Sequence, residues 1–185
     1  MGRACPFLLG YFLISPLRKL VQDPRKILGP NVKPGMRVLD VGSAMGYFSI
    51  PLAEMVGPQG KVYCVDIQEK MLAVLRKRAG KRGLLDRIET RLAQPDSLMI
   101  DDLAGQIDFA LAFAVVHEVP DRARLLSQVS SALKPGGTLL IAEPKGHTSV
   151  ADYQAAIGTA RQFGLDMTGE PAIWGSRSGL LRRPG

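Results

Sequence analysis

The hydrophobic residues of the chain fall into short continuous runs, and stretches with helical spacing separate the runs from one another. The runs consist largely of aliphatic and aromatic residues and lack the strict alternation of a strand with one wet face, which predicts strands buried on both sides. Such strands are predicted at 38–41, 62–65, 107–116 and 138–142, with the third strand in chain order at 88–92.

Between these strands, apolar residues recur at the three- and four-residue intervals of a helix with one buried face. Helices are predicted at 47–56, 67–79, 121–133 and 150–160, and Asp121 takes the capping position of the third. Lys134–Gly137 is predicted to be a turn before the strand at 138–142.

The two ends of the chain complete the pattern. Ser15–Pro16 and Asp23–Pro24 each place a capping residue before a proline, which predicts short helices at 17–21 and 25–28. At the other end, 165–168 and 178–182 are predicted to form a closing antiparallel strand pair.

The alternation of strands and helices predicts an α/β fold with a doubly wound, mostly parallel, seven-stranded sheet. A length of 185 residues with 46% hydrophobic residues fits one compact domain. We expect residues 34–185 to form that domain and residues 1–33 to form an N-terminal helical lid or collar.

A net charge of +7 raises the question of an acidic partner such as nucleic acid. The basic residues concentrate on and just after one predicted helix, without the interleaved aromatic residues that single-strand binders use, so nucleic-acid binding is disfavoured. The apolar stretch 7–14 is too short to span a bilayer and has no signal-peptide cleavage site after it. A weak peripheral membrane contact remains a minority interpretation. The two cysteines suggest neither a disulfide nor a metal site, which favours the cytoplasm.

Candidate chemistry gathers where the predicted strands end. Asp40, Asp66 and the segments 94–97, 117–119 and 143–147 all follow strands, and ligands of such sheets bind at the carboxyl ends, near the point where strand order reverses. The run 38–46 ends in a turn of small residues that permits close approach of a ligand to the backbone. The pattern predicts a nucleotide-type cofactor site.

These residues resemble the class I methyltransferases that use S-adenosylmethionine, which have a Rossmann-like fold. Asp40–Gly46, with the sequence DVGSAMG, is similar to the D-x-G-x-G-x-G turn of that family, and Lys134–Gly137 is similar to its L-K-P-G-G segment. The resemblance implies S-adenosylmethionine as cofactor, with Asp66 accepting hydrogen bonds from the ribose. The implied cofactor-binding residues are Asp40, Gly42, Ser43, Ala44, Gly46, Asp66, Ile67, Gln94, Asp96 and Ser97. Ala44 replaces the usual middle glycine, and Gln94 replaces the acid common beside adenine.

Direct displacement of the methyl group needs no metal and no covalent intermediate, and a general base only if the acceptor must lose a proton. The resemblance places acceptor-facing groups after the fourth strand. The candidate catalytic residues are His117, His147 and Glu143, and the candidate substrate-binding residues are Tyr11, Phe12, Glu118 and Lys145. For His117, a role in holding neighbouring loops is an equal alternative.

We therefore expect a methyltransferase that acts on a small molecule, as a monomer or homodimer. An RNA or protein methyltransferase is the alternative within the class. An NAD-dependent oxidoreductase is the chief rival, because Asp66 follows Gly46 at about the spacing of a ribose-binding acid, although the chain lacks the full G-x-G-x-x-G. A non-catalytic cofactor-binding protein is the remaining alternative.

Overall fold

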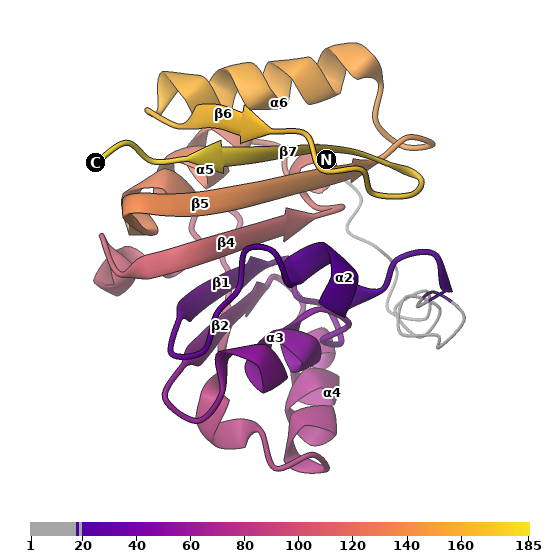
Figure 1. Cartoon of the computed structure of the whole chain (residues 1–185), viewed down its shortest axis with the longest axis vertical. Coiled ribbons are helices and arrows are strands. Elements are labelled where there is room, and N and C mark those ends of the chain that lie inside the picture. Colours follow the sequence, from indigo (N-terminus) through magenta and orange to yellow (C-terminus); the bar gives the residue numbers. More distant parts are fainter. Residues whose placement is uncertain (1–17, 19) are drawn as a thin grey trace.

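A computed structural model of the chain describes residue 18 and residues 20–185. It contains a seven-stranded sheet in the order β3-β2-β1-β4-β5-β7-β6, in which the first five strands are parallel and β7 runs antiparallel to both neighbours (Figure 1). The strands are β1 Arg37–Val41, β2 Lys61–Asp66, β3 Ile88–Leu92, β4 Ile107–Phe113, β5 Leu133–Pro144, β6 Asp166–Gly169 and β7 Ser176–Arg182. The predicted fold class and the closing antiparallel strands are confirmed.

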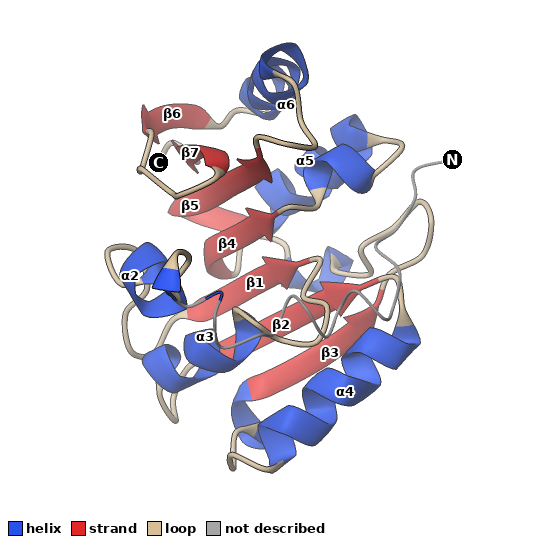
Figure 2. Ribbon diagram, turned by 90° about the vertical axis from the view of Figure 1, so that its right-hand side faces the viewer, coloured by secondary structure: helices blue, strands red, loops and turns tan. Residues whose placement is uncertain are grey.

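The helices cover both faces of the sheet (Figure 2). They are α2 Pro24–Leu28, α3 Ser49–Val56, α4 Glu69–Gly80, α5 Arg122–Ala132 and α6 Val150–Gln162, with short 3-10 turns η2 Leu85–Arg87, η3 Asp101–Leu103 and η4 Val116–Glu118. The caps predicted for two of them are present: Asp23 accepts a hydrogen bond from the Arg25 amide and Asp121 from the Arg124 amide, both at 2.9 Å. The helix predicted at 17–21 lies partly outside the described residues.

Alternate residues of each central strand enter different hydrophobic cores. In β1, Val38 packs with α2, α3 and α4, whereas Leu39 packs with α5 and α6. In β4, Phe109 joins the first core and Ala110 the second. Because both faces are apolar, these strands appear in the sequence as continuous hydrophobic runs.

The Lys-Pro-Gly-Gly segment differs from its prediction. It was expected to be a turn before the strand, but it lies inside β5, where the register against β4 shifts between Ile107 and Phe109. Gly137 has no room for a side chain, since a Cβ there would lie 2.9 Å from the Ile107 carbonyl oxygen. The Gly136 amide and the Gly137 carbonyl both pair with Arg183. Because β4 packs against this segment on one side and Arg183 pairs with it on the other, a sequence typical of a turn forms an irregular part of the strand.

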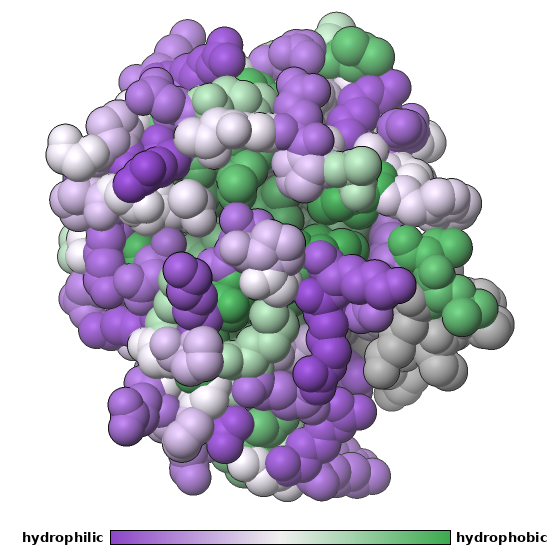
Figure 3. Space-filling model, in the orientation of Figure 1, coloured by the Kyte–Doolittle hydropathy of each residue, from purple (hydrophilic) through white to green (hydrophobic). Residues whose placement is uncertain are grey.

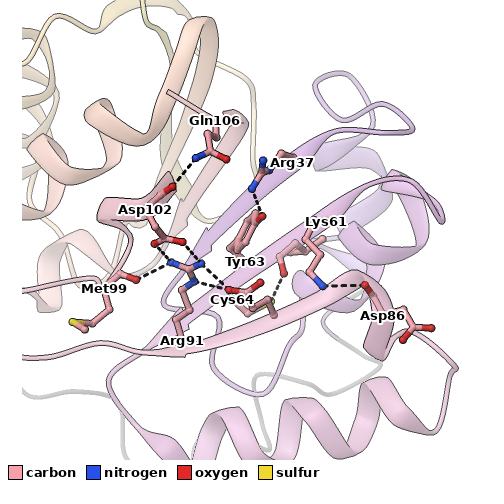
Figure 4. Close-up of polar contacts among 11 residues, drawn as sticks. Arg37, Lys61, Tyr63, Cys64, Asp86, Arg91, Met99, Asp102 and Gln106 are labelled. Carbon is pink, nitrogen blue, oxygen red and sulfur yellow. Dashed lines mark hydrogen bonds and ion pairs between the residues drawn. The ribbon is translucent and has the colours of Figure 1, made fainter. Parts of the chain in front are cut away.

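Residues 93–106, which join β3 to β4, contain the short η3 and no α-helix. Arg91 fastens the connection instead (Figure 4): its guanidinium donates to Glu89 at 2.7 Å, to Asp102 at 2.8 Å and to the Met99 carbonyl at 3.0 Å. The centre of that guanidinium also lies 5.1 Å from the centre of the Tyr63 ring.

The basic surface of α4 is partly compensated. Arg76 pairs with Glu69, Arg82 lies 3.4 Å from Glu54, and Arg78 donates to the Met45 carbonyl. Figure 3 shows mixed, mainly hydrophilic residues over the part of the molecule that holds α3 and α4. Within the described residues, no helix is long and apolar enough to cross a membrane.

The Arg91 contacts predict an unequal effect of removing two arginines. Arg91→Met should lower the free energy of unfolding by roughly 1–2 kcal/mol, because it removes two ion pairs and a carbonyl contact from a mostly buried side chain. Arg76→Met removes a more exposed pair and should cost about 0.5 kcal/mol or less. Urea unfolding measures both. Equal losses would show that Arg91 does not anchor the β3–β4 connection.

Candidate functional site

A cavity of about 520 Å³ lies at the carboxyl ends of the parallel strands, where strand order reverses between β1 and β4. Its volume falls in the range of small-molecule sites, and its position is the one that the rule for open α/β sheets predicts. Its walls come from the turn after β1 (40–45), the end of β2 (65–68), the loop after β3 (93–98) and the segment after β4 (113–121).

The turn after β1 is held from both sides. A Cβ on Gly42 would lie 2.7 Å from a methyl group of Val115, so the turn packs directly against the exit of β4. Gly42 has a φ of 72°, and Ala44 has a φ of 46°, which is left-handed for a residue with a side chain. Asp66 accepts a hydrogen bond from the Ala44 amide at 2.8 Å and so fixes the turn in this conformation.

The acids after β1 and β2 are both buried. Asp40 is 3% exposed and accepts the Ser49 hydroxyl at 2.6 Å. Burial raises the pKa of Asp40 to about 7, while the Ser49 hydrogen bond opposes the rise and the charge of Asp66 adds to it. Burial also raises the pKa of Asp66, against the backbone amides of Gln68, Ala44 and Ile67.

The loop after β3 forms a tight turn at the cavity wall. Gln94 and Ser97 exchange backbone hydrogen bonds of 2.8 and 3.2 Å. Contacts with α5 hold the turn in place: the Gln128 side chain accepts from the Leu98 amide at 2.7 Å, and Arg124 lies 3.4 Å from Asp96. Three predicted residues, Gln94, Asp96 and Ser97, therefore line the cavity together.

His117 lines the cavity and pairs through Nδ1 with Glu143 of β5. Glu143 is 1% exposed and also accepts from the amides of Val115 and Val116, at 3.2 and 2.9 Å, and from the Thr148 hydroxyl at 3.2 Å. The hydrogen bond with Glu143 raises the pKa of His117 against the effect of burial, and the charges of Glu143 and Glu118 add to the rise. The carboxylate thus joins the exit of β4 to the end of β5.

Aromatic residues form another part of the wall. Phe48 and Phe113 lie 4.5 Å apart between ring centres, and the Arg18 guanidinium lies 4.3 Å from the centre of the Tyr47 ring. Sequence reasoning did not assign these residues to the site. Tyr47 and Phe48 directly follow the glycine turn and Phe113 ends the fourth strand, so their positions carried a usable signal. Arg18 stands in the segment that was expected to form a lid, but nothing in the sequence singled it out.

The other predicted residues are divided. Ile67, Glu118 and His147 line the cavity with those already described. Gly46 does not line it: a Cβ there would lie 2.9 Å from Leu75 of α4, so this glycine serves helix packing. Lys145 is exposed away from the cavity, and Glu143 reaches it only through His117. Tyr11 and Phe12 lie outside the described residues.

The cavity retains a buried polar group that suits a polar ligand. The Ser43 hydroxyl is buried and has no hydrogen-bond partner among the residues that the structure describes. The cavity wall also has two buried acids and a glycine turn whose backbone is held in place by a hydrogen bond. The residues present therefore fit a nucleoside cofactor with an amino-acid tail. The fold and site define a Rossmann-like enzyme of the class that binds such cofactors.

Comparison with known proteins gives the family. A model described as "Methyltransferase domain" matches residues 32–170. A ubiquinone/menaquinone biosynthesis C-methyltransferase from Brucella canis is 35% identical over 116 residues, which are 63% of this chain and 42% of that protein. The chain thus matches less than half of this relative's length.

Solved structures share the fold. A SAM-dependent methyltransferase from Aquifex aeolicus superposes with a TM-score of 0.84 at 24% identity, covering 97% of this chain and all of the other (100%). An arsenic(III) S-adenosylmethionine methyltransferase from Chlamydomonas reinhardtii gives a TM-score of 0.65 at 21% identity, covering 84% of this chain and 65% of that one.

The chain belongs to the methyltransferase-domain family. The expectation of a class I S-adenosylmethionine-dependent methyltransferase is confirmed, and S-adenosylmethionine is the cofactor that this family implies.

The left-handed conformation of Ala44 predicts a stabilising substitution. Ala44→Gly should raise the free energy of unfolding by roughly 0.5–1 kcal/mol, because glycine adopts a positive φ without steric cost. Ala73→Gly, at an exposed position of α4, should lower it by about 1 kcal/mol. Thermal or urea unfolding compares the two variants. A loss of stability in Ala44→Gly would contradict the strain assigned to this turn.

Asp40 predicts a pH-dependent difference in stability. Its raised pKa means that the folded protein binds the proton more tightly than the unfolded chain, so the stability that this proton contributes is complete below about pH 4 and is lost as pH rises to about 7. Asp40→Asn avoids that loss and should stabilise the protein by roughly 4 kcal/mol at pH 8, with little change near pH 4.

Urea unfolding at both pH values measures the difference, with exposed Asp101→Asn as the matched control that should change little at either pH. A pH-independent effect of Asp40→Asn would rule out the titration of Asp40 as its cause.

Proposed function

We propose that this protein transfers a methyl group from S-adenosylmethionine to a small organic acceptor by direct displacement. The observation that carries the proposal is the pair formed by Asp66 and the turn 42–45, which meet at one wall of the cavity. Asp66 would hold the ribose, the turn and the Ser43 hydroxyl would hold the methionine part, and the Gln94–Ser97 loop would flank the adenine.

Methyl transfer by direct displacement requires no covalent intermediate with the protein. S-adenosylmethionine supplies an activated methyl group when bound, so the residues of the chain need to hold the acceptor in line and keep water out. The apolar rings of Phe48 and Phe113 suit that task. Gln22 adds to it, since its carbonyl accepts a hydrogen bond from the Tyr47 hydroxyl at 2.8 Å. This contact supports a lid role for the described part of the N-terminal segment, residues 20–33.

The acceptor is proposed to be an apolar or aromatic small molecule. Phe48, Phe113 and Tyr47 form a wall that fits a planar ring, and the relatives named as quinone-biosynthesis C-methyltransferases support such an acceptor. An RNA acceptor is less well supported, because Arg76 and Arg82 of the basic helix pair with acids of the chain itself.

Asp66 supplies the test of cofactor binding. Asp66→Asn should weaken S-adenosylmethionine binding by about 10- to 100-fold, because the amide accepts hydrogen bonds less strongly than a charged carboxylate and can no longer accept the ribose and both backbone amides. Isothermal calorimetry measures the affinity, and circular dichroism checks folding. Asp101→Asn is the matched control and should bind as the unaltered chain does. Binding of NAD without binding of S-adenosylmethionine would refute the proposal.

A further inference from the structure

The His117 ring lines the cavity, and one of its nitrogens, Nδ1, is committed to the protein. Nδ1 pairs with the Glu143 carboxylate, which can only accept when ionised, so Nδ1 carries the hydrogen. In a neutral imidazole this leaves Nε2 as an acceptor with a lone pair. No hydrogen bond from a described residue occupies Nε2.

Glu143 is held more rigidly than pairing with a histidine alone requires. Its two oxygens receive the amides of Val115 and Val116, the Thr148 hydroxyl and His117. The two amides belong to the segment that carries His117, so one buried carboxylate sets both the position of the backbone and the orientation of the ring. His117 also lines the cavity, and within the described residues its second nitrogen has no hydrogen-bond partner, an arrangement that a role in holding loops alone does not require.

We propose that His117 is the general base of this site, taking a proton through Nε2 from a hydroxyl-bearing acceptor, and that Glu143 is the residue that positions it. The proposal rests on the proposed function and names its acceptor class: a phenol, enol or hydroquinone. The attacking atom of the acceptor bonds to the methyl carbon, the electron pair of the breaking S–C bond returns to sulfur, and the acceptor proton passes to Nε2 and then to solvent. Atoms and charge therefore balance, with one proton released for each methyl group transferred.

Several charged groups surround this ring and act on its titration. Glu143 approaches from β5, Glu118 from the same short turn η4, and the His147 ring lies 6.1 Å away between centres. Around the rest of the cavity the charged residues are Arg18, Asp40, Asp66, Asp96, Asp121 and Arg124. Among the described residues, Glu143 is the hydrogen-bond partner of the His117 ring, so it should dominate the behaviour of Nδ1.

The test compares two matched ligands that differ by the transferable methyl group and its positive charge. The chain has only two histidines, so ¹⁵N-histidine labelling and long-range ¹H–¹⁵N spectra report each ring, with His147→Gln for assignment. In complexes with S-adenosylhomocysteine and S-adenosylmethionine, neutral His117 should carry its hydrogen on Nδ1. Its titration midpoint should be about one pH unit lower with S-adenosylmethionine, because a nearby positive charge disfavours the protonated ring.

Two substitutions test the positioning role. Glu143→Gln should lower the titration midpoint of His117 and disturb its tautomer, whereas Glu118→Gln should lower the midpoint less and keep the tautomer. If Glu143→Gln does not fold, Thr148→Val removes one hydrogen bond to the same carboxylate at low cost in shape. The comparison of the two ligands needs no variant of His117 or Glu143.

The outcomes separate the two proposals. If calorimetry shows that neither ligand binds, the proposed function fails and the general base fails with it. If both ligands bind and His117 titrates identically in the two complexes, or if its neutral form carries the hydrogen on Nε2, His117 is not the base and the proposed function stands. A lower midpoint with S-adenosylmethionine and a proton on Nδ1 support both.

Discussion

Buried carboxylates at the ends of three parallel strands hold together the loops that enclose the cavity. Asp40 in β1 accepts from Ser49 at the start of α3, and Asp66 in β2 accepts from the Ala44 amide in the turn after β1. Glu143 in β5 accepts from the amides of Val115 and Val116 after β4. Asp66 and Glu143 thus each hold a loop that leaves the neighbouring strand, so the walls of the cavity depend on one another.

This arrangement explains how charged groups can be buried beside the cavity. A buried acid is costly unless donors surround it, and backbone amides of the adjacent loop are donors that cannot move away. Glu143 has several donors, two of them backbone amides, whereas the side chain of Asp40 has Ser49 as its one hydrogen-bond partner within the described residues and has a raised pKa. Asp40 and Asp66 both line the cavity, so hydrogen bonds from a polar ligand would offset part of the free-energy cost of burying these acids.

Much of this fold could be predicted because the information is local. The buried runs at 38–41 and 62–65 have no alternation, and the acids after them fall at strand ends, so Asp40 and Asp66 were assigned to the site from position alone. What escaped prediction depends on contacts distant in sequence. The Lys-Pro-Gly-Gly segment became strand through Ile107 and Arg183, and Arg18 reached the aromatic wall from outside the sheet.

The glycine turn shows why a departure from a motif need not disable a site. A glycine can be required for space, for a positive φ or for both, and Gly42 and Gly46 meet both conditions, against Val115 and Leu75. Ala44 meets only the conformational one, with its φ of 46°, and its amide is held by Asp66 at 2.8 Å. An alanine there costs some backbone strain, which a hydrogen bond to a buried carboxylate can offset. The chain therefore departs from the motif at Ala44, the position of the three where a methyl group costs least. The acid that holds the Ala44 amide, Asp66, is also the residue proposed to bind the ribose.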